Sequence, residues 1–362
     1  MAKSNENLAR VTRIGLDLAK NVCQGHGVDG RGEAVVARKL RRAAVLEFFR
    51  RVAPCVVAME ACGSAHHWGR EITALGHEVK LIPPAHVKPY IRRNKTDAAD
   101  AAAICEAALR PQQRFVPLRT VDNQAELMRH RLREQLVSQR TALLNALRGH
   151  LSEIGVIAPQ GAPHAYRLKR LAEGDADDNG EIVVCEAVRA ALAPLAKQID
   201  ALDEAIAAID KELETAAKAD EKAKRLMTIP GIGPVTATAT AIAATVRDLE
   251  AFASGREFAA FLGLTPRQHS TGGKQRSGGV SKMGDRYLRK LLVVGATAVL
   301  HHAAGHSDAL RRWAKEMLKR KAAHKYAFKL TAVALANKLA RIVYAILRSG
   351  APYDDRPVAR RA

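Results

Sequence analysis

The segment RVTRIGLDLAK (residues 10–20) predicts a short β-strand that carries an acidic side chain, Asp17. Apolar residues alternate with small or polar ones, a pattern typical of a strand with a buried face. Aspartate is disfavoured inside strands and is rarely buried without a partner, so Asp17 points to a specific role. This strand therefore sets the predicted fold of the first domain and marks a candidate site.

Strand and helix patterns alternate over residues 1–118. Further predicted strands are GEAVVARKL (32–40), CVVAMEACG (55–63) and EVKLIPP (78–84). Predicted helices are AAVLEFFRRV (43–52), AHHWGREITALGH (65–77) and a helix that starts near Asp97. This order predicts an α/β domain with a partly parallel sheet.

Two long helices are predicted in residues 119–224, joined by a loop around APQGAPHAY (158–166) and EGDADDNGE (173–181). The second helix has apolar residues at alternating spacings of four and three: Leu195, Ile199, Leu202, Ile206, Ile209 and Leu213. That heptad pattern predicts a coiled coil within or between chains, and the alternative is an ordinary core-facing helix. We expect residues 225–350 to form a mostly α-helical domain and 351–362 a disordered tail.

The composition predicts a polyanionic partner. The 362 residues include 58 Lys and Arg against 37 Asp and Glu, a formal net charge of +21. A surplus of this size favours nucleic acid over a merely solvated surface. The five cysteines contain no CxxC pair, which argues against a zinc knuckle, and no secretory leader or membrane span is evident. We expect a cytoplasmic protein that associates with nucleic acid and does not bind a membrane.

Four acids occupy positions that would converge in such a fold: Asp17, Glu60, Asp97 and Asp100. The first two lie in predicted strands, and the last two open a predicted helix. Strand ends and helix starts meet at one edge of an α/β sheet. Four converging carboxylates would bind one or two Mg²⁺ ions, which prefer oxygen ligands. The alternative for the helix pair is a simple complement to the helix dipole.

The segment RQHSTGGKQRSGG (267–279) surrounds Ser270 with glycines and positive charge. Glycines let backbone amides approach phosphate oxygens, and a serine nucleophile needs nearby positive charge or a base. Its predicted phosphate-contacting residues are Arg267, His269, Lys274, Arg276 and Lys282. The alternative is a plain phosphate-binding loop with a capping serine.

Other segments also predict contacts with phosphates. Arg92, Arg93 and Lys95 form a short basic run. IPGIGPVTA (229–237) resembles a helix-hairpin-helix turn, in which Gly231 and Gly233 would expose backbone amides. An ordinary Gly-Pro connection between helices is the alternative.

Four blocks in the chain resemble a known family. IGLDLAKN (14–21), AMEACGSAHHWGRE (58–71) and NKTDAADAAAI (94–104) look like the D-E-D-D tetrad of the IS-one-ten family of transposases. LTPRQHSTGGKQRSGGVSKMGDRYLRKLL (264–292) is similar to that family's C-terminal signature, especially in its IS-eleven-eleven branch. The Piv-type DNA invertases share this plan.

The resemblance implies a first domain with the RuvC-like, ribonuclease H fold, in which Asp17, Glu60, Asp97 and Asp100 bind Mg²⁺. It implies a nucleophilic serine, by position Ser270, with Thr271, Ser277 and Ser281 as nearby alternatives. It further implies a dimer or tetramer that a structured bridge RNA guides to donor and target double-stranded DNA.

The sequence therefore predicts an RNA-guided DNA transposase or recombinase that forms a phosphoserine intermediate. Three alternatives stay open: a metal-dependent nuclease of branched DNA, a site-specific DNA invertase, and a non-enzymatic architectural protein.

Overall fold

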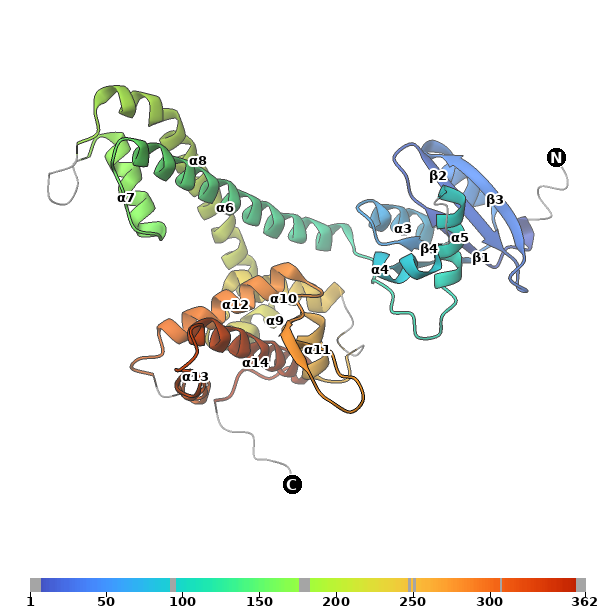
Figure 1. Ribbon diagram of the computed structural model, residues 1–362. Coiled ribbons are helices and arrows are strands. Elements are labelled where there is room, and N and C mark those ends of the chain that lie inside the picture. The colour runs from blue at the N-terminus through green and yellow to red at the C-terminus, as the bar shows by residue number, and fades with distance from the viewer. Residues whose placement is uncertain are drawn as a thin grey trace. The chain divides into compact units, whose positions relative to one another are not determined.

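The computed structural model describes residues 8–91, 96–175, 183–246, 249, 252–306 and 308–355. The chain forms two compact units, the first of which extends to Gln124 (Figure 1). The first unit is mixed α/β, and the second is helical apart from a two-stranded hairpin. The second unit comprises residues 125–245 and 249–362, and so covers most of the two segments predicted separately as 119–224 and 225–350.

A five-stranded sheet forms the centre of the first unit, in the order β3-β2-β1-β4-β5. Its strands are β1 (Arg13–Asp17), β2 (Val22–Val28), β3 (Ala34–Arg41), β4 (Val56–Glu60) and β5 (Glu78–Ile82). β1, β4 and β5 run parallel, whereas β2 is antiparallel to both of its neighbours. The predicted α/β domain with a partly parallel sheet is confirmed.

Helices cover both faces of this sheet. They are η1 (Arg42–Ala44), α2 (Val45–Arg51), α3 (Ala65–Ala74), α4 (Pro84–Val87), η2 (Lys88–Tyr90) and α5 (Asp97–Ala107). Ile14 and Leu16 of β1 belong to the core that contains residues of α2 and α3. Ala58 of β4 belongs to a separate core with Ile104 of α5. Alternate residues of one strand therefore face different helices.

Helix α5 packs unusually closely on β1 at Gly15. A Cβ atom on Gly15 would lie 2.2 Å from the carbonyl oxygen of Ala101 and 2.6 Å from the amide nitrogen of Cys105. Ala101 and Cys105 are both buried, so small side chains permit this approach from the helix side. Only glycine fits at position 15, and the contact fixes where α5 lies along β1.

The second unit contains nine helices among its described residues. These are α6 (Val121–Glu153), α7 (Ala162–Glu173), α8 (Glu186–Ala219), α9 (Glu221–Met227), α10 (Pro234–Val246), α11 (Gly255–Phe261), α12 (Arg286–His301), α13 (Ala309–Arg320) and α14 (Ala327–Ser349). The first turn of α6 belongs to the first unit. α7 begins inside a stretch that we expected to be loop, since Pro163 suits the first turn of a helix.

The two long helices, α6 and α8, pair antiparallel within the chain. Arg133 on α6 makes two hydrogen bonds to the carboxylate of Asp210 on α8. About two turns further along α6, Arg140 donates a hydrogen bond to the carboxylate of Asp203 at 2.6 Å. On α8, Ile199, Ile206 and Leu213 are buried at intervals of seven residues. A coiled coil, within or between chains, stays a prediction, because an ordinary core-facing helix would bury the same residues.

The helix α14 is the central element of the largest apolar core. Leu335, Leu339 and Val343 are fully buried among α9, α11 and α12. By length and composition this helix could cross a membrane, but half of that apolar window is buried inside the protein. Its hydrophobicity is explained by its place in the core.

The tail predicted to be disordered is partly held in place. The amide of Tyr353 donates to Thr228 Oγ1 at 2.8 Å, and the amide of Ala309 donates to Asp355 Oδ1 at 2.8 Å. These bonds explain the order of residues 351–355. Residues 356–362 lie outside the described part of the chain.

A buried histidine joins α6 to α10 and α12. His130 is 1% exposed, with Tyr287 Oη 3.1 Å from Nδ1 and Thr238 Oγ1 3.2 Å from Nε2. Thr238 Oγ1 also lies 2.8 Å from the carbonyl oxygen of Pro234, to which it donates its single proton. Nε2 must then donate to Thr238, while Nδ1 accepts from Tyr287. Burial and the nearby Arg133 lower the pKa of His130 to about 4.

Acidification should therefore destabilise the second unit through His130. The folded-state pKa lies below the unfolded value, so the stabilisation is present above pH 6.5 and is lost as pH falls toward 4. Linkage gives a loss of about 2 kcal/mol between pH 7.5 and pH 5. Urea unfolding of the wild type and His130→Gln at both pH values checks this. An equal pH dependence in the two proteins would contradict it.

Candidate functional site

Two of the predicted acids lie side by side at one edge of the sheet. Asp17 is the last residue of β1 and Glu60 the last of β4. The parallel register pairs Leu16 with Met59, so the next residues are Asp17 and Glu60. Neighbouring strands are about 4.8 Å apart. Both acids are half-buried.

The remaining two acids stand in the first turn of α5. Thr96 caps this helix by accepting a hydrogen bond from the amide of Ala99 at 3.2 Å. Asp97 is exposed, whereas Asp100 is half-buried. One turn beyond Asp97, Ala101 makes the close contact with Gly15.

The direction of α5 brings its acidic end to the same edge as Asp17. Cys105 and Glu106, late in α5, line a cavity together with Arg13 at the start of β1. The helix therefore runs antiparallel to β1, and its first turn lies toward the end of the strand. Gly15 faces α5, and by alternation so does Asp17. Ala58 faces α5 in the same way, which gives Glu60 this orientation.

The four carboxylates suit a hard divalent cation by the chemistry of their oxygens and by their shared edge and face. Among the described residues, no group of three or more His, Cys, Asp or Glu side chains is already gathered closely enough to hold an ion. The backbone directs the four acids to one edge of the sheet, and their joint binding of a metal ion stays a prediction. Arg92, Arg93 and Lys95, which we predicted to contact phosphates, lie outside the described residues.

Ser270 lies near the tip of an exposed β-hairpin, where we expected an irregular loop. The hairpin strands are β6 (Pro266–Gln268) and β7 (Ser277–Val280). At the tip, the amide of Lys274 donates to the carbonyl of Thr271 at 3.0 Å, and Gly272 and Gly273 have φ of 55° and 75°. Two positive φ values in a two-residue turn define type I′, which twists as the strands do. The hydroxyl of Ser270 is therefore displayed on an ordered ribbon.

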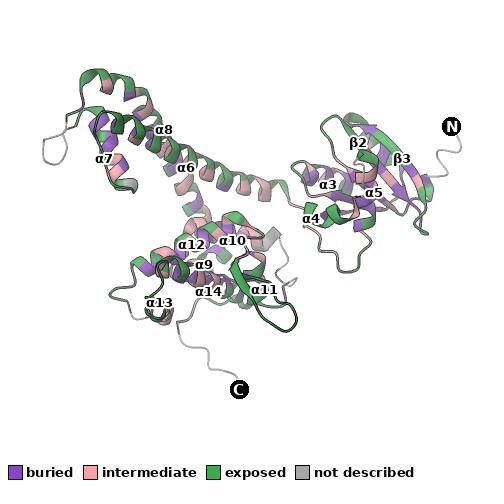
Figure 2. Cartoon of the chain, in the orientation of Figure 1, coloured by how far each residue is buried: buried purple, intermediate pink, exposed green. Residues whose placement is uncertain are grey.

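The cationic residues predicted around Ser270 are all exposed (Figure 2). They are Arg267, His269, Lys274, Arg276 and Lys282. In the part of the chain that the structure describes, none of them has an ion-pair partner. The ribbon therefore presents its positive charge to solvent, where a phosphate could meet it.

The base of this hairpin is held rigidly. A Cβ on Gly263 would lie 2.1 Å from the carbonyl oxygen of Met283, and one on Gly284 would lie 1.8 Å from that of Phe261. Arg289 of α12 donates to the carbonyl oxygens of Leu262 at 2.9 Å and Met283 at 2.7 Å, one on each side of the base. Sequence reasoning missed Arg289, because nothing in RYLRKLL separates this arginine from an ordinary surface one.

The predicted helix-hairpin-helix turn joins α9 to α10. Gly231 has φ of 86°, and a Cβ there would lie 2.7 Å from the carbonyl oxygen of Gly295 on α12. Packing against α12 thus explains the glycine at 231. Gly233 is exposed, with open space around it. A phosphate contact at Gly231 and Gly233 stays a prediction.

The chain matches two family models and several relatives along most of its length. Residues 223–312 match the model described as "Transposase IS116/IS110/IS902 family", and residues 14–156 match a DEDD transposase model. A probable family 20 transposase of Pseudomonas aeruginosa is 47% identical over 93% of this chain and 97% of its own length.

The transposase for insertion sequence element IS1111A of Coxiella burnetii is 38% identical, over 95% of this chain and 92% of its own. A pilin gene-inverting protein of Moraxella bovis is 33% identical over 38% of this chain and 40% of its own. The family resemblance that the sequence motifs indicated is confirmed. With such identity along nearly the whole chain, the protein belongs to the IS116/IS110/IS902 family of transposases, and its first unit is a DEDD transposase domain of the RuvC-like type.

Proposed function

We propose that this transposase moves an insertion sequence under the guidance of a structured bridge RNA, and that it cuts DNA through a phosphoserine at Ser270. The observation that supports the chemistry most strongly is the shared edge of Asp17 and Glu60, with the first turn of α5 beside it. The exposed position of Ser270 on an ordered hairpin is the second support.

The chemistry assigns a separate role to each set of residues. Asp17, Glu60, Asp97 and Asp100 would hold Mg²⁺, which stabilises developing charge on the oxygens of a phosphodiester. Ser270 Oγ attacks the phosphorus, so that an Oγ–P bond forms while the bond to one deoxyribose oxygen breaks. The leaving oxygen ends with the proton that the serine loses. Because the number of phosphoester bonds is conserved, rejoining needs no external energy source.

The charge distribution supports a partner with a phosphate backbone. The chain carries a net charge of +21 but only 4% aromatic residues. Backbone and shape contacts with a folded RNA and with DNA duplexes use cations, whereas reading of single-stranded bases uses aromatic platforms. A protein of this composition would leave sequence choice to base pairing by a guide. We further propose that it acts as a dimer or tetramer in the bacterial cytoplasm.

Site-specific inversion is the second candidate function. It is favoured by the similarity to the pilin gene-inverting protein, which covers part of the chain. Inversion and transposition would use the same residues and would differ in how the DNA sites are arranged.

Replacement of Ser270 by Ala should abolish strand transfer, because it removes the hydroxyl that we propose as the nucleophile. We expect a fall on the order of 10⁶-fold, the scale for removal of a nucleophilic serine. The measurement is joining of labelled donor and target duplexes, with the covalent protein–DNA adduct followed on denaturing gels. Ser277→Ala, a serine of the same hairpin, is the matched control. Continued cleavage by Ser270→Ala would instead favour a metal nuclease.

Replacement of Asp17 by Asn should remove Mg²⁺-dependent cleavage, because the proposed metal site loses a carboxylate. DNA binding should be kept, because the substitution leaves the fold unchanged. Mg²⁺ binding measured by calorimetry should weaken in parallel. Glu78→Gln is the control, since Glu78 begins β5 at the opposite edge of the sheet and pairs with Lys80 at 3.2 Å. Unchanged cleavage in Asp17→Asn would contradict a role for this acid in metal binding, whereas DNA binding without any Mg²⁺-dependent cleavage by the wild type would favour an architectural protein.

Guidance by RNA predicts a discrete co-purifying RNA. The purified protein should carry a single structured species transcribed from beside its own gene, because the guide must match the mobile element. Extraction and sequencing of the bound nucleic acid provide the measurement. A random sample of cellular RNA would contradict RNA guidance. That outcome would not test the proposed chemistry of Ser270.

A further inference from the structure

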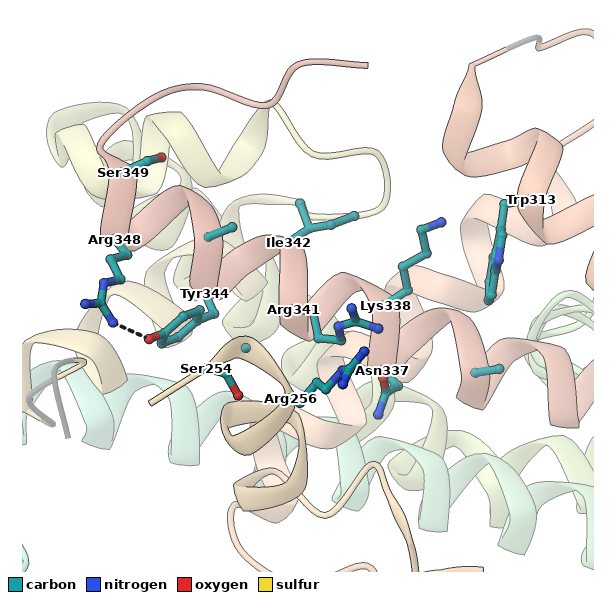
Figure 3. A pocket seen from close by; sticks show the side chains of 13 residues that line it. Ser254, Arg256, Trp313, Asn337, Lys338, Arg341, Ile342, Tyr344, Arg348 and Ser349 are labelled. Carbon is teal, nitrogen blue, oxygen red and sulfur yellow. Dashed lines mark hydrogen bonds between the residues drawn. The ribbon is translucent and has the colours of Figure 1, made fainter. Parts of the chain in front are cut away.

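A basic cleft lies in the second unit where α11 meets α14, with Trp313 of α13 at its far end (Figure 3). Its volume is about 950 Å³. Four of its lining side chains are cationic: Arg256, Lys338, Arg341 and Arg348. Among the described residues that line it, none is acidic. Neither the sequence analysis nor the family similarity assigns a role to this cleft.

The fold forces these cations onto one surface. Lys338, Arg341 and Arg348 are spaced by three and seven residues on α14, so they share a helix face. The other face of α14 is buried in the core at Leu339 and Val343. The positive charges therefore cannot spread around the helix.

A close backbone contact adds the fourth cation. A Cβ on Gly255 would lie 3.2 Å from the carbonyl oxygen of Arg341, so α11 approaches α14 closely at this point. Arg256 follows directly and lies beside Arg341 in the cleft (Figure 3).

Three of the four cations of the cleft lack, among the described residues, the carboxylate partners that arginines have elsewhere in this unit. On α6, Arg133 and Arg140 pair with aspartates of α8. In contrast, Arg256, Lys338 and Arg341 have no ion-pair partner among the described residues. Partial burial and the charge of Arg341 lower the pKa of Lys338, which shows that the charges oppose one another. An anionic ligand would relieve this repulsion.

The length of the cleft distinguishes a polymer from a single phosphate. Ten residues of α14 separate Lys338 from Arg348, which corresponds to about 15 Å at 1.5 Å per residue. One strand of a duplex presents a phosphate about every 3.4 Å along the axis, so the cations span several consecutive phosphates. Arg348 is oriented by a 2.8 Å hydrogen bond to Tyr344 Oη, and Lys338 lies 4.5 Å from the ring centre of Trp313.

We propose that the basic cleft binds the phosphodiester backbone of one strand of a polynucleotide and holds it in register with the Ser270 hairpin. Asn337, which lines the cleft, donates to the carbonyl oxygen of Leu264 at 3.2 Å, two residues before β6. This hydrogen bond connects a residue that lines the cleft to the chain segment at the base of the hairpin. The inference rests on the proposed function in one respect, namely that the polynucleotide is the substrate DNA or the guide RNA.

Trp313 offers a direct optical test in the full-length protein. The chain has two tryptophans, and Trp68→Phe leaves Trp313 as the only one. Titration of this variant with a 20-bp duplex DNA, and separately with an RNA hairpin, should produce a saturable change in Trp313 emission. The arm with the larger change identifies the bound polynucleotide. No change in either arm would overturn the proposal.

Charge removal tests the same cleft through the salt dependence of binding. In the Trp68→Phe background, Arg256→Ala/Arg341→Ala should weaken binding on the order of tenfold near 0.15 M salt. The plot of the logarithm of the binding constant against the logarithm of the salt concentration should become less steep by about 2. This corresponds to about 0.9 for each of the two duplex phosphate contacts that are lost. Arg312→Ala/Lys329→Ala is the matched control, because it removes the same charge at exposed positions of this unit outside the cleft. Equal slopes in the two double variants would overturn the proposal.

Stability and catalysis separate this inference from the proposed function. Without nucleic acid, Arg341→Ala should unfold at the same temperature as the wild type or at a higher one, because a repulsive charge is removed. A clear fall would mean that the side chain supports the fold and would count against a ligand site. Ser270→Ala should retain the Trp313 response in full. A result that contradicts the serine chemistry would therefore leave the proposal for the cleft standing. A result that contradicts the cleft would in the same way leave the proposal for Ser270 standing.

Discussion

The contact between Gly15 and α5 fixes the geometry of the carboxylate site. A helix that approached β1 at an ordinary distance would be free to slide, and its first turn would have no fixed position relative to the strand ends. Here backbone atoms of Ala101 and Cys105 stand where a Cβ would be. The sheet register then places Asp17 beside Glu60, and the helix contact places Asp97 and Asp100 at the same edge. Two backbone constraints therefore direct the four proposed metal ligands to the same edge of the sheet.

The second unit contains two groups of cationic side chains, which differ in their contacts with carboxylates. Along α6, arginines are neutralised by aspartates of α8, and these pairs connect the long helices. Among the described residues, the arginines and lysines of the hairpin, and Arg256, Lys338 and Arg341 of the basic cleft, have no carboxylate partner. Paired charges at a partly buried interface specify how helices align. A partly buried cation without a carboxylate partner lowers the stability of the fold unless an anionic ligand binds to it. The distribution separates the cations that build the protein from those that remain for a ligand.

Much of the fold was predictable from the sequence, because its strands and long helices have clear patterns. β2 was missed, since VCQGHGV contains two glycines and polar residues that weaken the strand signal. One of these, Gly27, lies where a Cβ would be 3.1 Å from Val36, a tight contact that favours glycine. The four acids of the proposed site could be singled out because each stands at a strand end or a helix start. The basic cleft could not be found, because Arg256 and Arg341 meet only through a tertiary contact at Gly255. His130 was missed for the same reason, since its partners come from distant helices.

The type I′ turn at Gly272 and Gly273 makes the Ser270 ribbon intolerant of changes in length. The hydrogen bond from His269 to Arg276 and the pairing of Thr271 with Lys274 continue one antiparallel ladder around Ser270. Side chains alternate between the two faces of such a ribbon, so a single inserted residue would exchange the surface that displays the hydroxyl for the opposite one. A substitution in this ribbon would keep the Ser270 hydroxyl on its present face, whereas an insertion of one residue would turn it toward the opposite face while leaving the local sequence almost unchanged.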